Sequence, residues 1–399
     1  MSDHIIYLDY AATTPLKAEV LDVMLPWLTS EYGNASSLYP LGLRARAAVE
    51  QAREQVAKVI GAKSEEIYFT SGGTEADNWA LLASAMKRKK KGNHIITTRI
   101  EHHAVLKSCA FLGENGFDIT YLPVQPNGLV DLKELEAAIT DQTILISVMT
   151  ANNEIGTIQP VREIGAIAKK HDILFHTDAV QAYGHIPIDV NEDHIDLLAA
   201  SAHKIGGPKG VGFLFIKKGL SPEPFIHGGH QEKRMRAGTE NVAGIVGFGK
   251  AAELIMNDMK KNTVQERSFR NQLITRILGE IPGTHLNGDR RQRLSNNVNI
   301  QFEGVDAEQL LLQLADKGIC VSGGSACASG SILPSHVLTA IGCSHEAALE
   351  SIRFTVGPDL TMQDIDETMR ILKIEVEELR KIAGVKREFK GFINWSVPC

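Results

Sequence analysis

The chain has no apolar run long enough to cross a membrane. A spanning helix needs roughly 18 consecutive apolar residues, and glycine or a charged residue interrupts every apolar stretch of these 399 residues sooner than that. The start of the chain, Met1-Ser2-Asp3-His4, lacks the basic segment and the apolar stretch of a signal peptide. We therefore expect a cytoplasmic protein with no membrane partner.

Cysteine and excess positive charge are scarce as well. Five cysteines with no Cys-x-x-Cys pair fit neither a disulfide framework nor a set of metal ligands, so no metal site is predicted. The 42 basic and 48 acidic residues give a net charge of -6, whereas a nucleic-acid-binding protein needs a basic face, so no nucleic-acid partner is expected. With 43% apolar and 23% charged residues, the composition is that of a globular protein of two or three domains.

The middle of the chain alternates short β-branched runs with amphipathic stretches. This alternation predicts a mainly parallel sheet with helices on both faces. The predicted strands are residues 66–70, 94–98, 119–123, 143–149, 173–177, 197–201 and 211–216. The predicted helices include residues 45–60, 131–139 and 161–171.

A sparser pattern follows a long helix predicted from Asn241 to about Lys260. Here strands at 297–302 and 352–356 stand among helices at 306–317 and 362–382. The predicted fold class is therefore α/β: a large domain with a seven-stranded, mainly parallel sheet flanked by helices, plus a smaller α+β domain. We expect the large domain to span residues 15–255 and the smaller one to combine residues 1–14 with 256–399.

Polar residues follow several predicted strands, and in open α/β sheets ligands bind at the carboxyl ends of the strands. The turn Gly72-Gly73-Thr74 leads from a strand into a helix, where backbone N–H groups can hold a phosphate. His102, Asn153 and Asp178 come after later strands. Taken singly, each has an ordinary explanation: a tight turn, a structural histidine, an Asx turn or a paired carboxylate.

Lys204 makes a shared function for these residues more plausible than separate structural roles. It stands in Ser201-Ala202-His203-Lys204, just after a buried strand and before a glycine-rich loop. A lysine that can form a Schiff base, a carboxylate such as Asp178 for a pyridinium nitrogen and a helix N-terminus for a phosphate are together what pyridoxal phosphate needs. The set is far more specific than any of its members.

One cysteine is placed differently from the others. Cys327 lies in a run of small residues from 322 to 331, where its thiol is the only reactive side chain and is free to act as a nucleophile. Cys109, Cys320 and Cys343 stand in apolar or helical settings that are typical of structural cysteines.

These motifs resemble the cysteine desulfurases of the NifS and IscS branch, within the class V aminotransferases of pyridoxal-phosphate fold type I. The resemblance runs from Tyr7-Leu8-Asp9-Tyr10-Ala11-Ala12-Thr13-Thr14-Pro15 to Ser351-Ile352-Arg353-Phe354 and covers nearly the whole chain. The segment Ser325-Ala326-Cys327-Ala328-Ser329-Gly330-Ser331 is its most specific part. Gly323 and Ala328 replace the Ser and Thr of many members, which leaves the role of Cys327 intact.

The resemblance implies how the cofactor, pyridoxal 5'-phosphate, is held. Lys204 is expected to hold it covalently and then to move protons at the substrate α-carbon, with Asp178 at the pyridinium nitrogen and Gln181 at the ring oxygen. His102 is expected to stack on the ring and assist proton transfer. The remaining cofactor-binding residues implied are Gly73, Thr74, Asn153, Ser201 and His203, with Thr239 supplied by the other subunit of a homodimer.

The resemblance also implies the reaction. Asn153 and Arg353 are expected to bind the carboxylate of L-cysteine, for which an arginine fork is suited. Cys327 then takes the substrate sulfur as a persulfide, leaves L-alanine and passes the sulfur to an iron–sulfur scaffold or another acceptor protein. A selenocysteine lyase or aminotransferase of the same fold would use Lys204 and Asp178 without needing Cys327, and a non-catalytic scaffold would keep only the fold.

Overall fold

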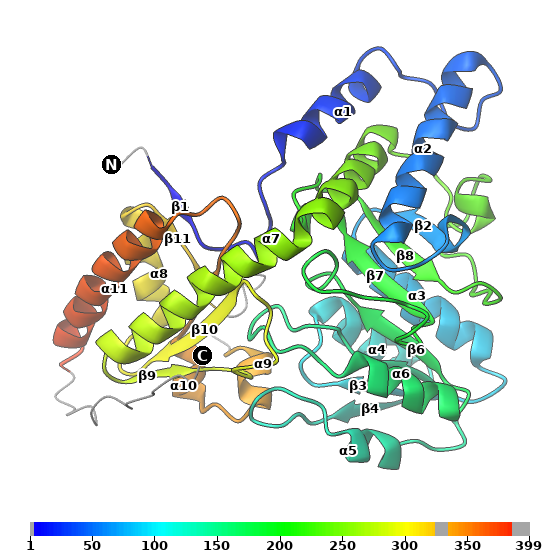
Figure 1. The fold of residues 1–399 in the computed structure, drawn as a ribbon. Coiled ribbons are helices and arrows are strands. Elements are labelled where there is room, and N and C mark those ends of the chain that lie inside the picture. The colour runs from blue at the N-terminus through cyan, green and yellow to red at the C-terminus, as the bar shows by residue number, and fades with distance from the viewer. Residues whose placement is uncertain (1–3, 324–333, 385–399) are drawn as a thin grey trace.

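The structure is a computed structural model, and it describes residues 4–323 and 334–384. Its largest element is a seven-stranded sheet in the order β2-β8-β7-β6-β5-β3-β4 (Figure 1). The strands are β2 (Ile67–Thr70), β3 (His94–Thr98), β4 (Asp118–Leu122), β5 (Thr143–Ser147), β6 (Leu174–Asp178), β7 (Leu197–Ser201) and β8 (Gly212–Ile216). Only β8 runs antiparallel to its neighbours within this sheet, so the predicted α/β fold with a mainly parallel sheet is confirmed.

Helices cover both faces of this sheet. On one face lie α2 (Pro40–Lys58), α6 (Val161–Lys170) and the first part of α7 (Val242–Glu280). On the other lie α3 (Gly73–Arg88) and α4 (His103–Glu114). Every residue of β3, β5, β6, β7 and β8 is buried, because a parallel sheet covered on both faces has no solvent side. The α5 helix (Leu132–Ala137) and α1 (Ala18–Leu28) lie further out.

A smaller antiparallel sheet has the strand order β12-β13-β10-β9. Its strands are β9 (Thr284–Leu286), β10 (Asn297–Phe302), β12 (Ser322–Gly323) and β13 (Ser351–Thr355). Its core includes residues of α8 (Ala307–Asp316), α11 (Met362–Ile382) and the second part of α7. Two short helices, α9 (His336–Ala340) and α10 (His345–Leu349), form a further cluster that also contains Ile100 and Met149 of the larger half.

The first described residues of the chain pack into this smaller half. Strand β1 (Ile6–Tyr7) pairs in parallel with β11 (Ile319–Cys320), and Ile6 and Leu8 belong to the same core as Phe354. We propose on this ground that residues 1–14 form a domain with residues 256–399, while residues 15–255 form the larger one.

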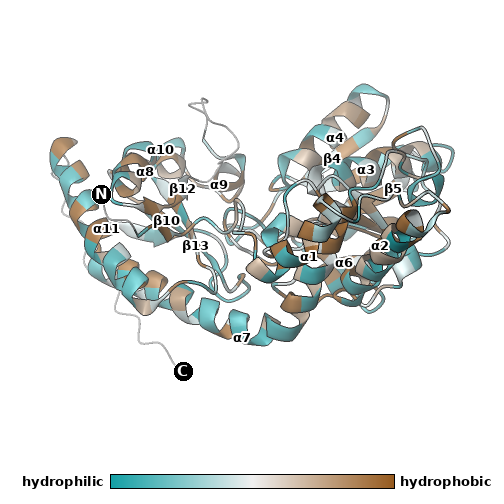
Figure 2. Cartoon of the chain, turned by 90° about the horizontal axis from the view of Figure 1, so that it is seen from above, coloured by the Kyte–Doolittle hydropathy of each residue, from teal (hydrophilic) through white to brown (hydrophobic). Residues whose placement is uncertain are grey.

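The α7 helix is longer than the sequence pattern predicted. The expected end near Lys260 is wrong, because the helix is unbroken from Val242 to Glu280, a length of 39 residues. Figure 2 shows it running beneath both halves of the molecule. Its buried residues fall in two groups, from Ala243 to Ile255 and from Glu266 to Ile277, one for each core. The stretch between the two groups is polar, because neither core covers the helix there. The repeating pattern of apolar residues therefore stops in this stretch, although the helix itself continues.

Within the described residues, no helix is both long and apolar enough to span a membrane.

Candidate active site

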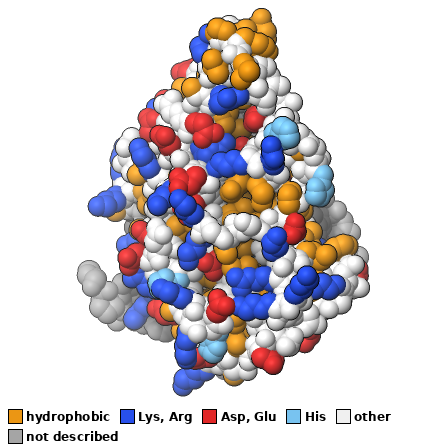
Figure 3. Space-filling view, turned by 90° about the vertical axis from the view of Figure 1, so that its right-hand side faces the viewer, with side chains coloured by type: hydrophobic (Ala, Val, Ile, Leu, Met, Phe, Trp, Pro, Cys, Tyr) orange, Lys and Arg blue, Asp and Glu red, His pale blue; other side chains and the backbone are white. Residues whose placement is uncertain are grey.

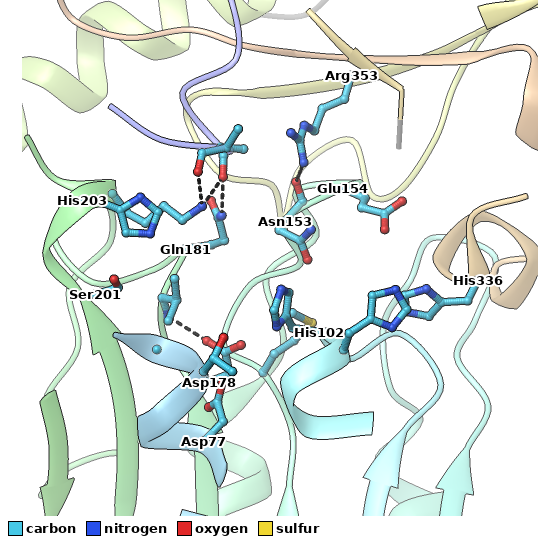
Figure 4. Close-up of a pocket in the computed structure, with 18 residues that line it drawn as sticks. Asp77, His102, Asn153, Glu154, Asp178, Gln181, Ser201, His203, His336 and Arg353 are labelled. Carbon is cyan, nitrogen blue, oxygen red and sulfur yellow. Dashed lines mark hydrogen bonds between the residues drawn. The ribbon is translucent and has the colours of Figure 1, made fainter. Parts of the chain in front are cut away.

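A cavity of about 370 Å³ opens at the carboxyl ends of β6 and β7 and is closed on another side by β13 of the smaller sheet (Figure 4). It brings together ten of the residues predicted from the sequence. These are Gly73, Thr74, His102, Asn153, Asp178, Gln181, Ser201, His203, Lys204 and Arg353. Its volume lies within the range of small-molecule and cofactor sites.

The N-terminus of α3 forms one end of the cavity. Helix residues Gly73 and Thr74 lie there beside Ser201, so backbone N–H groups and two hydroxyls converge where an anion can bind. Gly73 is required by its surroundings, because a Cβ at this position would lie 2.5 Å from Cγ2 of Val180. His203 lies alongside, and its Nδ1 is 3.1 Å from the hydroxyl oxygen of Thr13. Burial lowers the pKa of His203 to about 4, so its ring is neutral at pH 7.

Lys204 projects into the cavity from η2 (Ala202–Lys204), the turn that follows β7. Its ammonium group donates hydrogen bonds to the backbone carbonyls of Ala11 and Ala12, the second at 2.9 Å. Gln181 also donates to the carbonyl of Ala11, at 2.9 Å. The N-terminal segment therefore holds the amine and the amide side by side, as the dashed lines in Figure 4 show.

The floor of the cavity is formed by carboxyl groups that are almost fully buried. Asp178 is 6% exposed, and its Oδ1 accepts a hydrogen bond of 2.9 Å from the Val180 N–H. Burial raises the pKa of Asp178, while His102, the Val180 N–H and Lys204 oppose that rise. Polar atoms of Asp77, His102 and Asp178 lie within 4.8 Å of one another. A cation at this point would compensate the buried negative charge.

His102 is held as a neutral ring with a defined tautomer. It is the N-cap of α4, and its Nδ1 accepts a hydrogen bond of 3.1 Å from the Ala104 N–H. The proton of the neutral ring is therefore on Nε2. Burial lowers the pKa of His102, with Asp178 acting in the opposite direction.

Arg353 enters from β13 on the far wall. Its Nη2 donates to Oδ1 of Asp9 at 2.7 Å and its Nη1 to the carbonyl of Asn153 at 3.0 Å. Its Nε is buried and has no hydrogen-bond partner among the described residues. Because Arg353 lines the cavity, its guanidinium is placed to bind a carboxylate there, the group that it binds best.

The cavity also contains residues to which the sequence analysis gave no role: Asp77, His103, Glu154 and His336. Asp77 could have been found, because it lies four residues after Gly73 and so on the same face of α3. Glu154 follows Asn153 directly. His336 comes from α9 and donates from Nε2 to the carbonyl of Glu101 at 2.9 Å, a contact that only tertiary structure brings about.

The cavity as described does not test two of the predicted residues. Cys327 lies outside the described residues, although the run that contains it begins as strand β12, with Ser322 buried. Thr239 is exposed in the segment between β8 and α7 and does not line the cavity of its own chain. Its expected contact with a second subunit stays a prediction.

Comparison with known proteins agrees with the geometry. The model of the class-V aminotransferase family matches residues 6–368. Cysteine desulfurase IscS of Dictyoglomus turgidum is 52% identical over 385 residues, which are 96% of this chain and 98% of that protein. A solved NifS-like protein is 36% identical with a TM-score of 0.86, covering 96% of this chain and 100% of its own. The structure titled SspA in complex with cysteine is 38% identical with a TM-score of 0.79, covering 88% and 99%.

The chain therefore belongs to the class-V aminotransferases and, among them, to the cysteine desulfurases, as the resemblance of its motifs indicated. This family depends on pyridoxal phosphate. The residues fit that group: a helix N-terminus and hydroxyls for its phosphate, a buried carboxylate for its ring nitrogen and a lysine amine inside the same cavity.

Proposed function

We propose that this chain removes the sulfur of L-cysteine, releases L-alanine and carries the sulfur on Cys327 to an acceptor protein. The observation that supports this most strongly is one cavity that is lined by Lys204, Asp178 and Arg353. Residues suited to the cofactor and a residue suited to a substrate carboxylate therefore lie in the same cavity. The 52% identity to a cysteine desulfurase over 96% of the chain supports the choice of substrate.

Different residues of the cavity would bind the cofactor and the substrate. When bound, pyridoxal phosphate supplies an electron sink for the pair of electrons released at the substrate α-carbon. Thr74, Ser201 and the N-terminus of α3 would bind its phosphate, and Asp178 would pair with the ring nitrogen. Arg353 and Asn153 orient the substrate carboxylate, which fixes the direction of the α-C–H bond.

Protons and sulfur are moved by three side chains. The Lys204 amine takes the proton from the α-carbon and returns one to the product. Neutral His102, with its proton on Nε2, would assist by donating or accepting a proton as the substrate changes charge. The Cys327 thiolate attacks the substrate sulfur: an S–S bond forms, the C–S bond breaks, and the carbon takes up a proton to become the methyl group of alanine.

We also propose a homodimer. Eight large apolar side chains are exposed within residues 16–43, and soluble monomers rarely leave such a patch uncovered. They are Leu16, Leu21, Leu25, Leu28, Tyr32, Leu38, Tyr39 and Leu43. Figure 3 shows apolar side chains gathered at the upper tip of the face on which α2 begins. In such a dimer, the resemblance implies that Thr239 of each copy completes the phosphate site of the other.

The sulfur acceptor is proposed to be an iron–sulfur scaffold, which the IscS name of the relatives suggests. A cytoplasmic location stays a prediction from the sequence.

The test of this function measures alanine and sulfide formed from L-cysteine. We expect Cys327→Ser to keep the cofactor and to lose sulfide release and the persulfide, which mass spectrometry detects on the Cys327 peptide. Lys204→Ala should lose alanine formation by several powers of ten together with the borohydride-reducible link to the cofactor. Full alanine and sulfide formation by Cys327→Ser would mean that another thiol carries the sulfur. A Cys327→Ala variant that keeps its rate with selenocysteine or in transamination would indicate a selenocysteine lyase or an aminotransferase, and a wild-type protein that binds no cofactor would indicate a scaffold.

A further inference from the structure

A buried pair of side chains lies directly beneath the cofactor cavity and has no place in the reaction described above. Asp77 is on the first turns of α3 and is 1% exposed, and His176 is on β6 and is 0% exposed. His176 and Asp178 are two residues apart on the same strand, so both point toward the sheet face that α3 covers. Asp77 thus lies next to the carboxylate that faces the ring nitrogen.

The two side chains meet through atoms that have no other partner. Oδ1 of Asp77 and Nε2 of His176 are 3.4 Å apart, and each is buried without a hydrogen bond to any other described residue. On its other side, Nδ1 of His176 lies 2.9 Å from the hydroxyl oxygen of Ser147. Two buried polar atoms at this separation are satisfied only if a single proton lies between them.

The location of that proton depends on which neighbouring groups are charged. Burial lowers the pKa of His176 to about 3, so this histidine is neutral. Burial also raises the pKa of Asp77, and the nearby carboxyl groups of Asp178 and Glu101 raise it further. No group acts on Asp77 in the opposite direction, since neutral His176 supplies no charge.

Asp178 is in a different position. It accepts the Val180 N–H and faces His102 and Lys204, all of which favour its ionised form. When Asp77 and Asp178 compete for one proton in the same low-dielectric space, the carboxyl without cationic or N–H partners takes it.

We propose that Asp77 is a neutral carboxylic acid that donates a hydrogen bond to Nε2 of His176, and that it thereby leaves Asp178 as the single negative charge opposite the cofactor ring nitrogen. Asp77 is a positioning residue that acts through Asp178. This inference depends on the proposed cofactor site and deepens it, because it says how two adjacent buried carboxyl groups coexist there.

The protonation of Asp77 can be observed by infrared spectroscopy, which separates protonated carboxyl groups from ionised ones. At neutral pH we expect Asp77→Asn to lose one protonated-carboxyl band relative to the wild type. The matched control is Asp364→Asn, because Asp364 is also buried but is held ionised by Thr361 and His4, which lower its pKa. This control should lose a carboxylate band and keep every protonated-carboxyl band.

The visible absorption of the holoenzyme gives an independent readout. A neutral Asp77 predicts that Asp77→Asn leaves the pH midpoint of the cofactor absorption unchanged, because an amide replaces an uncharged acid. Asp178→Asn, which removes a negative charge beside the ring, should shift that midpoint to lower pH by about one unit or more. Asp77→Leu, which cannot donate to His176, should weaken cofactor binding at least tenfold, whereas Asp77→Asn should not.

Unchanged protonated-carboxyl bands in Asp77→Asn, or a midpoint that falls as it does in Asp178→Asn, would show that Asp77 is ionised and overturn the proposal. If Asp77→Asn does not fold, wild-type protein labelled with ¹³C at the aspartate carboxyl groups serves instead, and the absence of any shifted protonated-carboxyl band is then the contrary result. These infrared measurements need no cysteine, so they fail or succeed separately from the assay of sulfur release.

Discussion

Glu154 shows how strongly burial acts on one side chain in the cavity wall. It is 3% exposed, and its Oε2 accepts a hydrogen bond of 2.5 Å from the Ser335 hydroxyl. Burial raises the pKa of Glu154 to about 7, although Ser335 and Arg353 oppose the rise. The folded protein therefore binds this proton more tightly than the unfolded chain does.

The consequence for stability has a definite sign. A group whose pKa is raised by folding stabilises the fold fully below its ordinary value of 4.5, and this contribution is lost as the pH rises through about 7. Glu154→Gln stays neutral at both pH values and can still accept from Ser335. We predict that this variant lacks the wild-type loss of stability, about 2.5 kcal/mol, between pH 5 and pH 8. Urea unfolding of both proteins at the two pH values measures it.

The control for this prediction is Glu367→Gln. Glu367 is half-buried on α11 beside Arg370, whose hydrogen bond lowers its pKa. The Glu367→Gln variant should lose as much stability between pH 5 and pH 8 as the wild type does. An unchanged pH dependence in Glu154→Gln would mean that Glu154 is already ionised in the fold.

Single residues differ in how far the sequence could predict them. Lys204 and Asp178 each follow a buried strand of one sheet, and all such strands deliver their next residues to the same edge. The positions of Lys204 and Asp178 just after predicted strands were therefore enough to predict that they share a site. Ala11 and His336 reach the cavity from segments that only the packing of the smaller half places there, so no local pattern marks their position.

At the scale of elements, the start of α3 determines how closely a ligand can approach. Gly73 and Val180 belong to α3 and to the loop after β6, and there is no room between them for a methyl group. We predict that Gly73→Ala displaces the first turn of α3 and weakens cofactor binding about tenfold or more, since small displacements of a binding site are costly. Titration of the apoprotein with pyridoxal phosphate measures the affinity.

The rescue variant distinguishes crowding from a loss of flexibility. Gly73→Ala combined with Val180→Ala removes the Cγ2 atom that the new methyl group would meet, and it should recover most of the lost affinity. A double variant as weak as Gly73→Ala alone would contradict this explanation.

The elements themselves were predictable to different degrees. All seven strands of the large sheet were predicted within a few residues, because continuous β-branched runs between turn residues are a strong signal. The short strands β9 and β12 were not predicted, because strands of three and two residues are too short to show an alternating pattern. The α7 helix was predicted about twenty residues too short, because its apolar stripe serves two separate cores and the stretch between them is polar.

At the scale of the whole molecule, the exposed apolar patch of residues 16–43 is the feature that a single chain leaves unexplained. We predict that Leu28→Asp together with Leu38→Asp converts the protein into a monomer, because charges are excluded from the centre of an apolar interface. Cofactor affinity should fall with it, since the Thr239 of a second copy would no longer be present. Light scattering measures the mass.

Leu312→Asp is the matched control, since Leu312 is 66% exposed on α8 and lies outside the patch. It should leave both the mass and the cofactor affinity unchanged. A wild-type monomer with tightly bound cofactor would contradict the dimer and the role of Thr239 together.

The pairing of β1 with β11 has a consequence for the growing polypeptide. Ile6 lies beside Ile319, so the first strand finds its partner only after more than 300 further residues have been synthesised. Ala11 and Ala12, which hold the Lys204 amine, follow that strand directly. A nascent chain that has completed the large sheet therefore still lacks one wall of its pocket, and the active site is finished only near the end of translation.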